Sequence, residues 1–156
     1  MERDATAERF WNAYLETLRD PIAASLRWYE VFRIGDGIDA ANEGAALIAQ
    51  GLKTATSSLL WAYEAAGKAL PEAGHLSIVA DGAGNPVCVV ETTAVAIRAF
   101  AEIDAAFAFD YGEWDRTLET WKDRCWAINA RRCDALGRTA APDMPLVCER
   151  FRVVYP

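Results

Sequence analysis

The residues best suited to chemistry lie between Gly51 and Ser58, where the sequence reads Gly-Leu-Lys-Thr-Ala-Thr-Ser-Ser. Lys53 and Thr56 are three residues apart, a spacing that brings an ammonium group beside a hydroxyl in an extended or turning segment. A lysine-activated nucleophile requires that pairing. A second interpretation treats Lys53 as a solvated residue after a helix cap, with the hydroxyl groups bonded to nearby backbone atoms.

Glu91 is the first acidic candidate for the same site. It follows Val87-Cys-Val-Val90 in a long run rich in valine and threonine, a composition typical of a half-buried strand. Its carboxylate either faces solvent at a sheet edge or belongs to a site. The single histidine, His75, follows a proline–glycine turn without any flanking motif. We therefore interpret His75 as structural.

Known catalytic and cofactor motifs are missing from the sequence. There is no dinucleotide fingerprint, phosphate-binding P-loop, serine-hydrolase elbow or zinc-protease helix. The four cysteines are widely separated and form no Cys-x-x-Cys pair. The sequence therefore predicts no cofactor, no structural zinc and four free thiols.

The composition is that of one folded domain. The chain has 156 residues, 53% of them hydrophobic and 25% charged. A chain of this length and composition can bury a hydrophobic core without disulfides or metal ions to stabilise it. The first residues resemble no signal peptide, and no apolar stretch reaches the length of a membrane span. We therefore expect a cytoplasmic protein with no membrane partner.

The net charge of −7 argues against broad, charge-driven binding to nucleic acid, so we expect no DNA partner. A role with RNA would need a local basic cleft. No pattern in the sequence specifies an oligomeric state.

The segments that must position the candidate residues alternate between helix and strand patterns. Apolar residues at intervals of three and four predict helices. We expect these helices over residues 6–18, 40–50, 59–66, 100–109 and 118–136. Asp39 is the expected cap of the second helix, while Gly67 and Gly137 end the third and the last.

Strand patterns occupy the rest of the chain. The expected strands cover residues 28–34, 53–57, 75–81, 87–97 and 146–155. The turn cluster from Asp81 to Pro86 joins two of them into a hairpin. This mixed order predicts an α+β domain built on a small curved sheet or barrel, with flanking helices and the N-terminal helix packed outside.

With these segments placed, the sequence resembles the ASCH domain family (activating signal cointegrator homology), which has a PUA-like fold, in its longer bacterial form. The resemblance covers residues 28–155. It rests on the segments Gly51–Glu64, Leu76–Gly82, Gly84–Thr93 and Asp143–Phe151. It implies a single ASCH domain over residues 1–156, in which residues 1–24 form an N-terminal helical extension.

The resemblance also implies a role with RNA and assigns residues to it. The family pattern Gly-x-Lys-x-x-Thr falls on Gly51, Lys53 and Thr56. One activity attributed to the family is cleavage of single-stranded RNA; another is hydrolysis of the amide in N4-acylated cytidines by a Thr-Lys-Glu arrangement. That arrangement would make Thr56 the nucleophile, Lys53 the base and Glu113 the acid that orients the lysine. Aligning Glu113 needs a one-residue gap, and Glu91 is the alternative acid.

The sequence departs from the family pattern at two positions near this site. Ser58 stands where the short amidohydrolase members carry an arginine that holds the substrate. Cys125 stands where long-form relatives often have a histidine. The resemblance therefore implies a substrate-binding contact at position 58 that differs from the short members.

Three functions follow from the resemblance, with single-stranded RNA or a modified nucleoside as the partner. The first is a ribonuclease in which Lys53 stabilises the phosphorane and Glu113 or Glu91 accepts a proton from the 2′-hydroxyl. A divalent ion held by those carboxylates is compatible with this reaction. The second is an N4-acylcytidine amidohydrolase.

The third function is a non-catalytic RNA- or nucleotide-binding module. In this module Lys53 contacts a phosphate, and Trp61, Tyr63 or Trp114 stacks on a base. The alternative for these aromatic residues is a place in the hydrophobic core.

Overall fold

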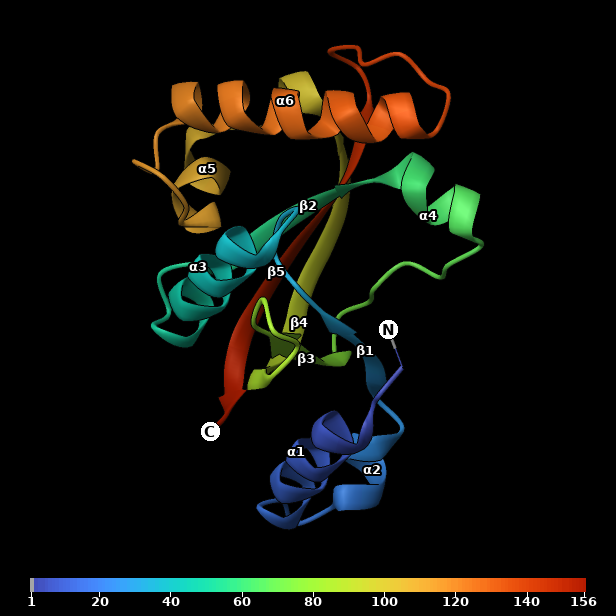
Figure 1. The fold of residues 1–156 in the computed structure, drawn as a ribbon, viewed down its shortest axis with the longest axis vertical. Helices are drawn as coiled ribbons and strands as arrows, with labels where there is room; N and C mark the ends of the chain where they lie inside the picture. The colour runs from blue at the N-terminus through green and yellow to red at the C-terminus, as the bar shows by residue number, and fades with distance from the viewer. Residues whose placement is uncertain (1) are drawn as a thin grey trace.

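The computed structural model of the chain describes residues 2–156. Its elements in chain order are α1 (Ala5–Glu16), α2 (Pro21–Ser25), β1 (Trp28–Phe32), α3 (Ile38–Ala49), β2 (Ala55–Leu59), α4 (Leu60–Ala66), β3 (Leu76–Ala80), β4 (Pro86–Ala99), the 3-10 helix η1 (Phe100–Glu102), α5 (Ala105–Tyr111), α6 (Leu118–Ala135) and β5 (Pro145–Tyr155). Figure 1 shows the helices placed around a central sheet, with α6 at the end opposite α1 and α2.

The five strands form one sheet in the order β1-β3-β4-β5-β2. β1 and β3 are parallel, and all other neighbours are antiparallel. The predicted α+β class, the five strand regions and the β3–β4 hairpin are therefore confirmed. The sheet is open, because β1 and β2 are its two edges and do not pair with each other. β4 and β5 bend strongly along their length (Figure 1).

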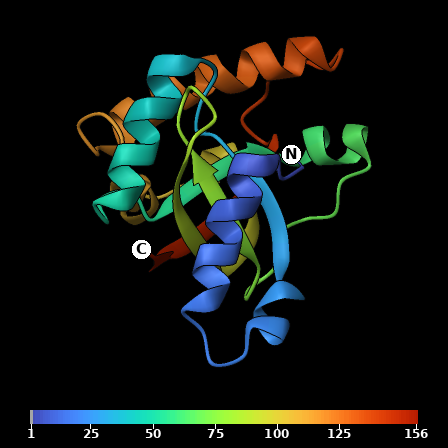
Figure 2. The same ribbon diagram turned by 60° about the horizontal axis from the view of Figure 1, so that its bottom comes forward.

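The interior strand β3, which lies between β1 and β4, is buried along its whole length because helices cover both faces of the sheet. Successive strand residues point to opposite faces. Ile78 accordingly packs in a cluster with Trp11 of α1, whereas Val79 packs in a cluster with Ile48 of α3. Figure 2 shows α1 lying across the sheet. The N-terminal helix therefore packs outside the sheet, as predicted.

A third hydrophobic cluster joins α5 and α6 to β2 and to the first half of β5. Trp121 of α6 is its centre, with only 1% of its surface exposed. The ring of Trp121 stacks on Phe100 at 5.4 Å between centroids and meets the ring of Tyr111 edge-on at 5.9 Å. This cluster fixes the end of α5, which carries part of the candidate site.

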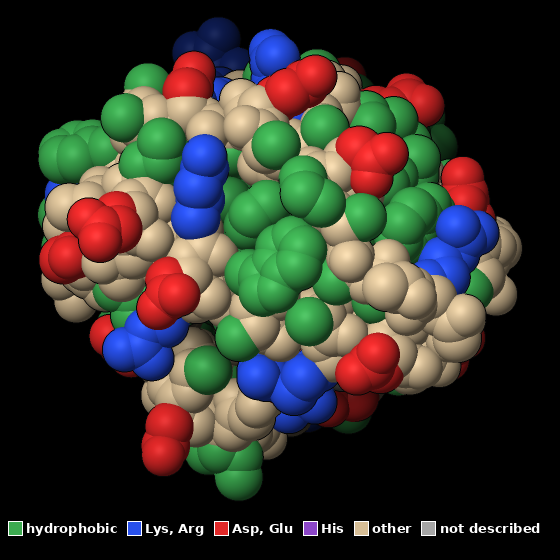
Figure 3. Space-filling view, turned by 90° about the horizontal axis from the view of Figure 1, so that it is seen from above, with side chains coloured by type: hydrophobic (Ala, Val, Ile, Leu, Met, Phe, Trp, Pro, Cys, Tyr) green, Lys and Arg blue, Asp and Glu red, His purple; other side chains and the backbone are tan. Residues whose placement is uncertain are grey.

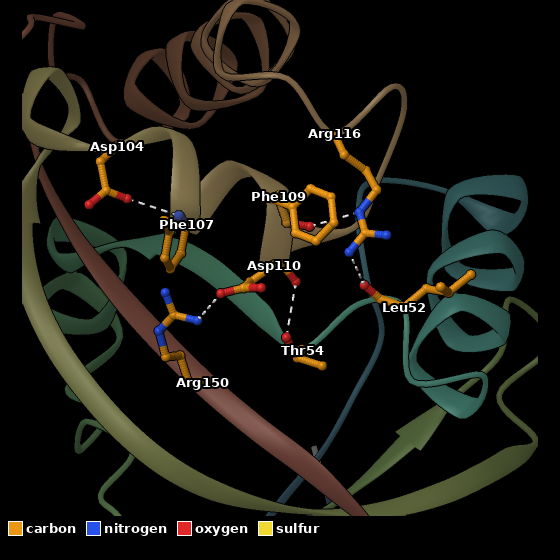
Figure 4. A network of polar contacts seen from close by, with 8 residues as sticks. All are labelled: Leu52, Thr54, Asp104, Phe107, Phe109, Asp110, Arg116 and Arg150. Carbon is orange, nitrogen blue, oxygen red and sulfur yellow. Dashed lines mark hydrogen bonds and ion pairs between the residues drawn. The ribbon is translucent and has the colours of Figure 1, made fainter.

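Polar contacts hold α5 against the start of β2 (Figure 4). The backbone N–H of Thr54 donates to the carbonyl of Asp110 at 2.8 Å. The Asp110 carboxylate pairs with Arg150 of β5 at 2.6 Å. Arg116 donates to the carbonyl of Phe109 at 2.9 Å and lies over its ring at 3.6 Å. These hydrogen bonds and this ion pair hold the segment just before β2 against α5.

Two helix predictions need correction. α3 begins at Ile38 after Gly37, which makes no side-chain cap bond, and Asp39 lies in the first turn instead of capping the helix. The helix expected over residues 100–109 is divided into η1 and α5, because the side chain of Asp104 accepts the backbone N–H of Phe107 and starts a new helix there.

Smaller differences concern element boundaries. β2 begins at Ala55, so Lys53 precedes the strand that was expected to include it. The short helix α2 separates α1 from β1. It begins with Pro21 at its first position, where the missing N–H costs nothing, and the Asp20 side chain caps it.

Two further expectations concern cysteines and membranes. Cys88, Cys125, Cys133 and Cys148 are all buried free thiols. Across residues 2–156, no helix combines the length and apolar character that crossing a membrane requires.

Gly112 provides a test of how tightly α5 is joined to the segment before β2. Its φ of +74° is left-handed, and a Cβ added there would lie 2.7 Å from the Cα of Lys53. Gly137 has a similar φ of +69° with open space around it. We expect Gly137→Ala to lower the free energy of unfolding by about 1 kcal/mol, from backbone strain alone. Gly112→Ala should lower it by at least ~3 kcal/mol, because overpacking adds to that strain. Urea unfolding of both variants measures the difference, and equal losses would show that this contact is not tight.

Candidate functional site

A cavity of about 480 Å³ lies between the two edge strands of the sheet. Its wall includes residues of β1 and β2, which stand at opposite ends of the strand order. The curvature of the sheet therefore brings the two edges to the same space. α4, α6 and the loop before α3 complete the wall. The volume lies within the usual range for small-ligand pockets.

Lys53 lies behind this cavity, with a fully buried side chain. Its Nζ donates to the carbonyls of Ala55 at 2.9 Å and Tyr111 at 3.0 Å, and it pairs with Glu113 Oε2 at 2.9 Å. It also lies 3.3 Å from the centre of the Tyr111 ring. An ammonium group has three N–H donors, and three acceptors surround this one.

The charge state of Lys53 follows from this surrounding. Burial lowers the pKa of its ammonium group from 10.5 to about 8, and the nearby Glu113 carboxylate opposes that decrease. Lys53 therefore carries its charge at neutral pH. Lys53 is not part of the cavity wall, whereas Glu113 is. Lys53, the base predicted from the sequence, therefore cannot contact a ligand in the cavity directly and can act on it only by way of Glu113.

The hydroxyl residues of β2 face the cavity. Thr56 and Ser58 are separated by one residue, so their side chains point to the same face of the strand, and both line the cavity. Thr56 lies opposite Glu149 in the β2–β5 pairing. The structure thus brings Thr56, Ser58 and Glu113 to one cavity, with Lys53 directly behind Glu113.

Glu91 lies elsewhere. Its carboxylate forms ion pairs with Arg27 and with Arg152, the second at 2.9 Å. Burial acts to raise the pKa of Glu91, but the hydrogen bonds from both arginines lower it overall. Glu91 does not line the cavity, so its expected place in the site needs correction. Of the two acids that the sequence left open, Glu113 is the one beside Lys53.

The predicted aromatic residues separate in the same way. Tyr63 and Trp114 line the cavity. Trp61 packs against the α5–α6 cluster, with Arg138 over its ring at 4.4 Å, so its expected place in the site also needs correction. His75 stacks on Tyr29 at 4.9 Å between ring centres, which agrees with its structural interpretation.

Sequence reasoning missed Glu149, which lines the cavity from β5. The hydroxyl of Thr92 donates to its carboxylate at 2.8 Å, and burial raises its pKa. The available signal was an acid among apolar residues in a strand, Val147-Cys-Glu-Arg-Phe151. The same signal singled out Glu91, and neither run of residues shows which strand borders a cavity.

The cations around the cavity were also missed. Arg33, Lys68, Arg131 and Arg132 line it. Arg132 of α6 pairs with Asp36 of the loop before α3 at 3.2 Å, and Lys68 pairs with Glu30 of β1. Acids and bases are similarly mixed on the surface seen from above α6 (Figure 3). The cavity wall therefore carries both carboxylates and cationic side chains.

The buried ammonium of Lys53 predicts that stability increases with pH above about 8. Between its lowered folded pKa of about 8 and the ordinary value of 10.5, the unfolded chain binds more protons than the folded chain, so the free energy of unfolding increases with pH. Relative to Lys53→Met, we expect the wild-type value to increase by roughly 2 kcal/mol between pH 7 and pH 10. Urea unfolding at both pH values measures this change, and Lys122→Met is the control. A difference that stays constant with pH would contradict the burial of a charged ammonium.

Comparison with known proteins agrees with this fold. An ASCH domain model matches residues 30–155. The crystal structure of an ASCH domain from Lactobacillus crispatus JV V101 is 29% identical and has a TM-score of 0.93, covering 100% of this chain and 98% of that one. A protein of Enterococcus faecalis V583 assigned to the family DUF984 is 29% identical with a TM-score of 0.83, covering 95% and 87%. No curated protein matches significantly. The chain therefore belongs to the ASCH domain family, a PUA-like group associated with RNA binding.

Proposed function

We propose that the protein is a ribonuclease that cleaves single-stranded RNA at the cavity between its edge strands. The observation that carries this proposal is the pairing of a proton acceptor, Glu113, with two guanidinium groups, Arg33 and Arg132, around one cavity. Transfer of a phosphoryl group needs both a base and a cation near the phosphorus atom. The association of the family with RNA supports the same class of substrate.

In this reaction the Glu113 carboxylate accepts the proton of the ribose 2′-hydroxyl, and the 2′-oxygen forms a bond to phosphorus. The bond from phosphorus to the 5′-oxygen breaks, and that oxygen takes a proton from solvent. The products are a 2′,3′-cyclic phosphate and a 5′-hydroxyl end. Arg33 and Arg132 stabilise the negative charge on the phosphorane.

Lys53 acts through Glu113 in this proposal, because its ammonium is covered and cannot touch the phosphate. Its role is to hold the carboxylate in place, which makes it a positioning residue. This role differs from the direct phosphate contact expected from the sequence.

Single-stranded RNA fits the cavity better than a duplex. Unpaired bases can leave the strand and stack on aromatic side chains, and Tyr63 and Trp114 supply such rings at the cavity wall. The mixed charges of the cavity wall and the net charge of −7 favour binding of one nucleotide in the cavity over binding of a long RNA along a basic surface.

A second candidate is hydrolysis of the amide in an N4-acylated cytidine, favoured by the Thr56 side chain in the same cavity. The Thr56 oxygen would attack the acyl carbon while Glu113 takes its proton. The C–N bond then breaks, the N4 nitrogen receives that proton, and water hydrolyses the acyl-threonine ester. Lys53 is a poor base for this step, because its N–H groups already face three acceptors.

The two reactions are separated by Glu113→Gln and Thr56→Ala, with the exposed Glu119→Gln on α6 as a control. We expect Glu113→Gln to slow cleavage of single-stranded RNA about 100-fold or more, the scale of general base catalysis. Thr56→Ala should weaken RNA cleavage but abolish any hydrolysis of N4-acetylcytidine. Rates are measured with a labelled oligonucleotide and with the nucleoside. The ribonuclease proposal is wrong if the wild-type protein binds RNA without cleaving it, or if Glu113→Gln cleaves within twofold of wild type.

A further inference from the structure

Glu149 has no part in the proposed cleavage, yet it faces the same cavity. The Thr92 hydroxyl is its hydrogen-bond donor, at 2.8 Å. Within residues 2–156, no lysine or arginine forms an ion pair with Glu149. Removing a carboxylate from water without a cation is unfavourable unless further donors reach it. The cavity is the direction from which those donors can come.

The neighbours of Glu149 do not supply them. Glu30 reaches the cavity from β1 and is another acceptor. Lys68 is already paired with Glu30 and lies close to the ring of Tyr63 at 5.3 Å. Burial, together with Glu30 and Glu149, raises the pKa of Tyr63 to about 12, so its phenol keeps its proton. Among residues 2–156, however, the Thr92 hydroxyl is the side-chain donor to Glu149, and the Tyr63 hydroxyl forms no hydrogen bond with it.

Asn129 of α6 gives a second and independent indication of a ligand. Only 3% of its surface is exposed, and it lines the same cavity. Its amide nitrogen donates to the carbonyl of Cys125 at 2.9 Å. None of residues 2–156 donates a hydrogen bond to its side-chain oxygen. An amide oxygen without a donor from the chain, on a residue that lines a cavity, is a place for a ligand N–H group.

These acceptors select the edge of a nucleobase. Guanine presents a ring N–H and an exocyclic amino group side by side, which match the two oxygens of one carboxylate. Adenine and cytosine place a ring nitrogen lone pair beside the amino group, and that lone pair repels an ionised carboxylate. Uracil flanks its single N–H with two carbonyl groups. Bases in single strands are commonly read on this edge.

We propose that Glu149 and Asn129 recognise guanine, so that the protein prefers RNA with guanosine at the cleaved position. Glu149 accepts both N–H groups of the guanine edge, and Asn129 accepts from a further donor of the same nucleoside. Arg33 and Arg132 meet the phosphate at the mouth of the cavity. This inference deepens the proposed function and rests on it.

The test measures binding of nucleotides, which needs no cleavage. Wild-type protein is titrated by calorimetry with the 3′-monophosphates of guanosine, inosine, adenosine and uridine. Inosine keeps the ring N–H but lacks the exocyclic amino group, so it should bind less tightly than guanosine. Adenosine should bind at least about tenfold less tightly than guanosine, the scale of one bidentate base contact.

Glu149→Gln should remove this preference, because an amide replaces one acceptor with a donor. Glu119→Gln is the matched control: it makes the same charge change on an exposed acid of α6 that does not line the cavity. The guanosine and inosine affinities of the wild type test the inference without any variant, in case Glu149→Gln does not fold.

The outcomes separate the inference from the proposed function. A guanosine preference that Glu149→Gln abolishes supports the inference, even if no RNA is cleaved and the ribonuclease proposal falls. Cleavage of RNA with equal affinity for all four nucleotides overturns the inference and leaves the ribonuclease standing. A guanosine preference that survives in Glu149→Gln also overturns it.

Discussion

One buried ammonium group determines the geometry of the candidate site. Lys53 donates to a carbonyl at the start of β2 and to a carbonyl at the end of α5, and it pairs with Glu113. Two segments that are distant in sequence, residues 53–55 and residues 111–113, therefore meet at one nitrogen atom. Burying a charge is unfavourable unless it is fully paired, so a displacement of any of these acceptors would destabilise the other contacts. This dependence fixes the carboxylate of Glu113 at the cavity wall.

The open sheet supplies the second half of the site. Its edges, β1 and β2, face a common cavity instead of pairing with each other. α6 and the loop before α3 close the remaining sides, joined by the ion pair of Arg132 and Asp36. An edge strand usually needs protection from pairing with another chain. Here one edge carries Thr56 and Ser58, which makes it part of a binding site.

Much of the fold follows from local sequence patterns. The β3–β4 hairpin was predicted from the turn cluster between Asp81 and Pro86, and the helical spacing predicted α6. The stretch Gly51–Ser58 drew attention because it combines a lysine with hydroxyl groups. The strand β2 explains why Thr56 and Ser58 line the cavity, because alternate residues of a strand face the same side. Lys53 precedes the strand and lies behind the cavity wall instead.

Other parts of the site depend on contacts that no local pattern contains. Glu91 and Glu149 look alike in sequence, since each is an acid within an apolar strand. Arg27 and Arg152 pair with the first, and the second borders the cavity. The burial of Lys53 depends on the close approach of Gly112, whose left-handed turn brings the end of α5 against the lysine backbone. Strand order and sheet curvature set the first outcome, and the packing of α5 against the segment before β2 sets the second.

The central claim is that the cavity between the edge strands holds one nucleotide of RNA beside Glu113. A crystal structure with a bound RNA trinucleotide, in which hydrogen replaces the reactive 2′-hydroxyl, tests this claim most directly. The account predicts an ordered nucleotide inside the cavity, with its 2′-carbon toward Glu113 and its phosphate near Arg33 and Arg132. An empty cavity with the trinucleotide ordered elsewhere, for example along the surface around Glu91, would contradict it.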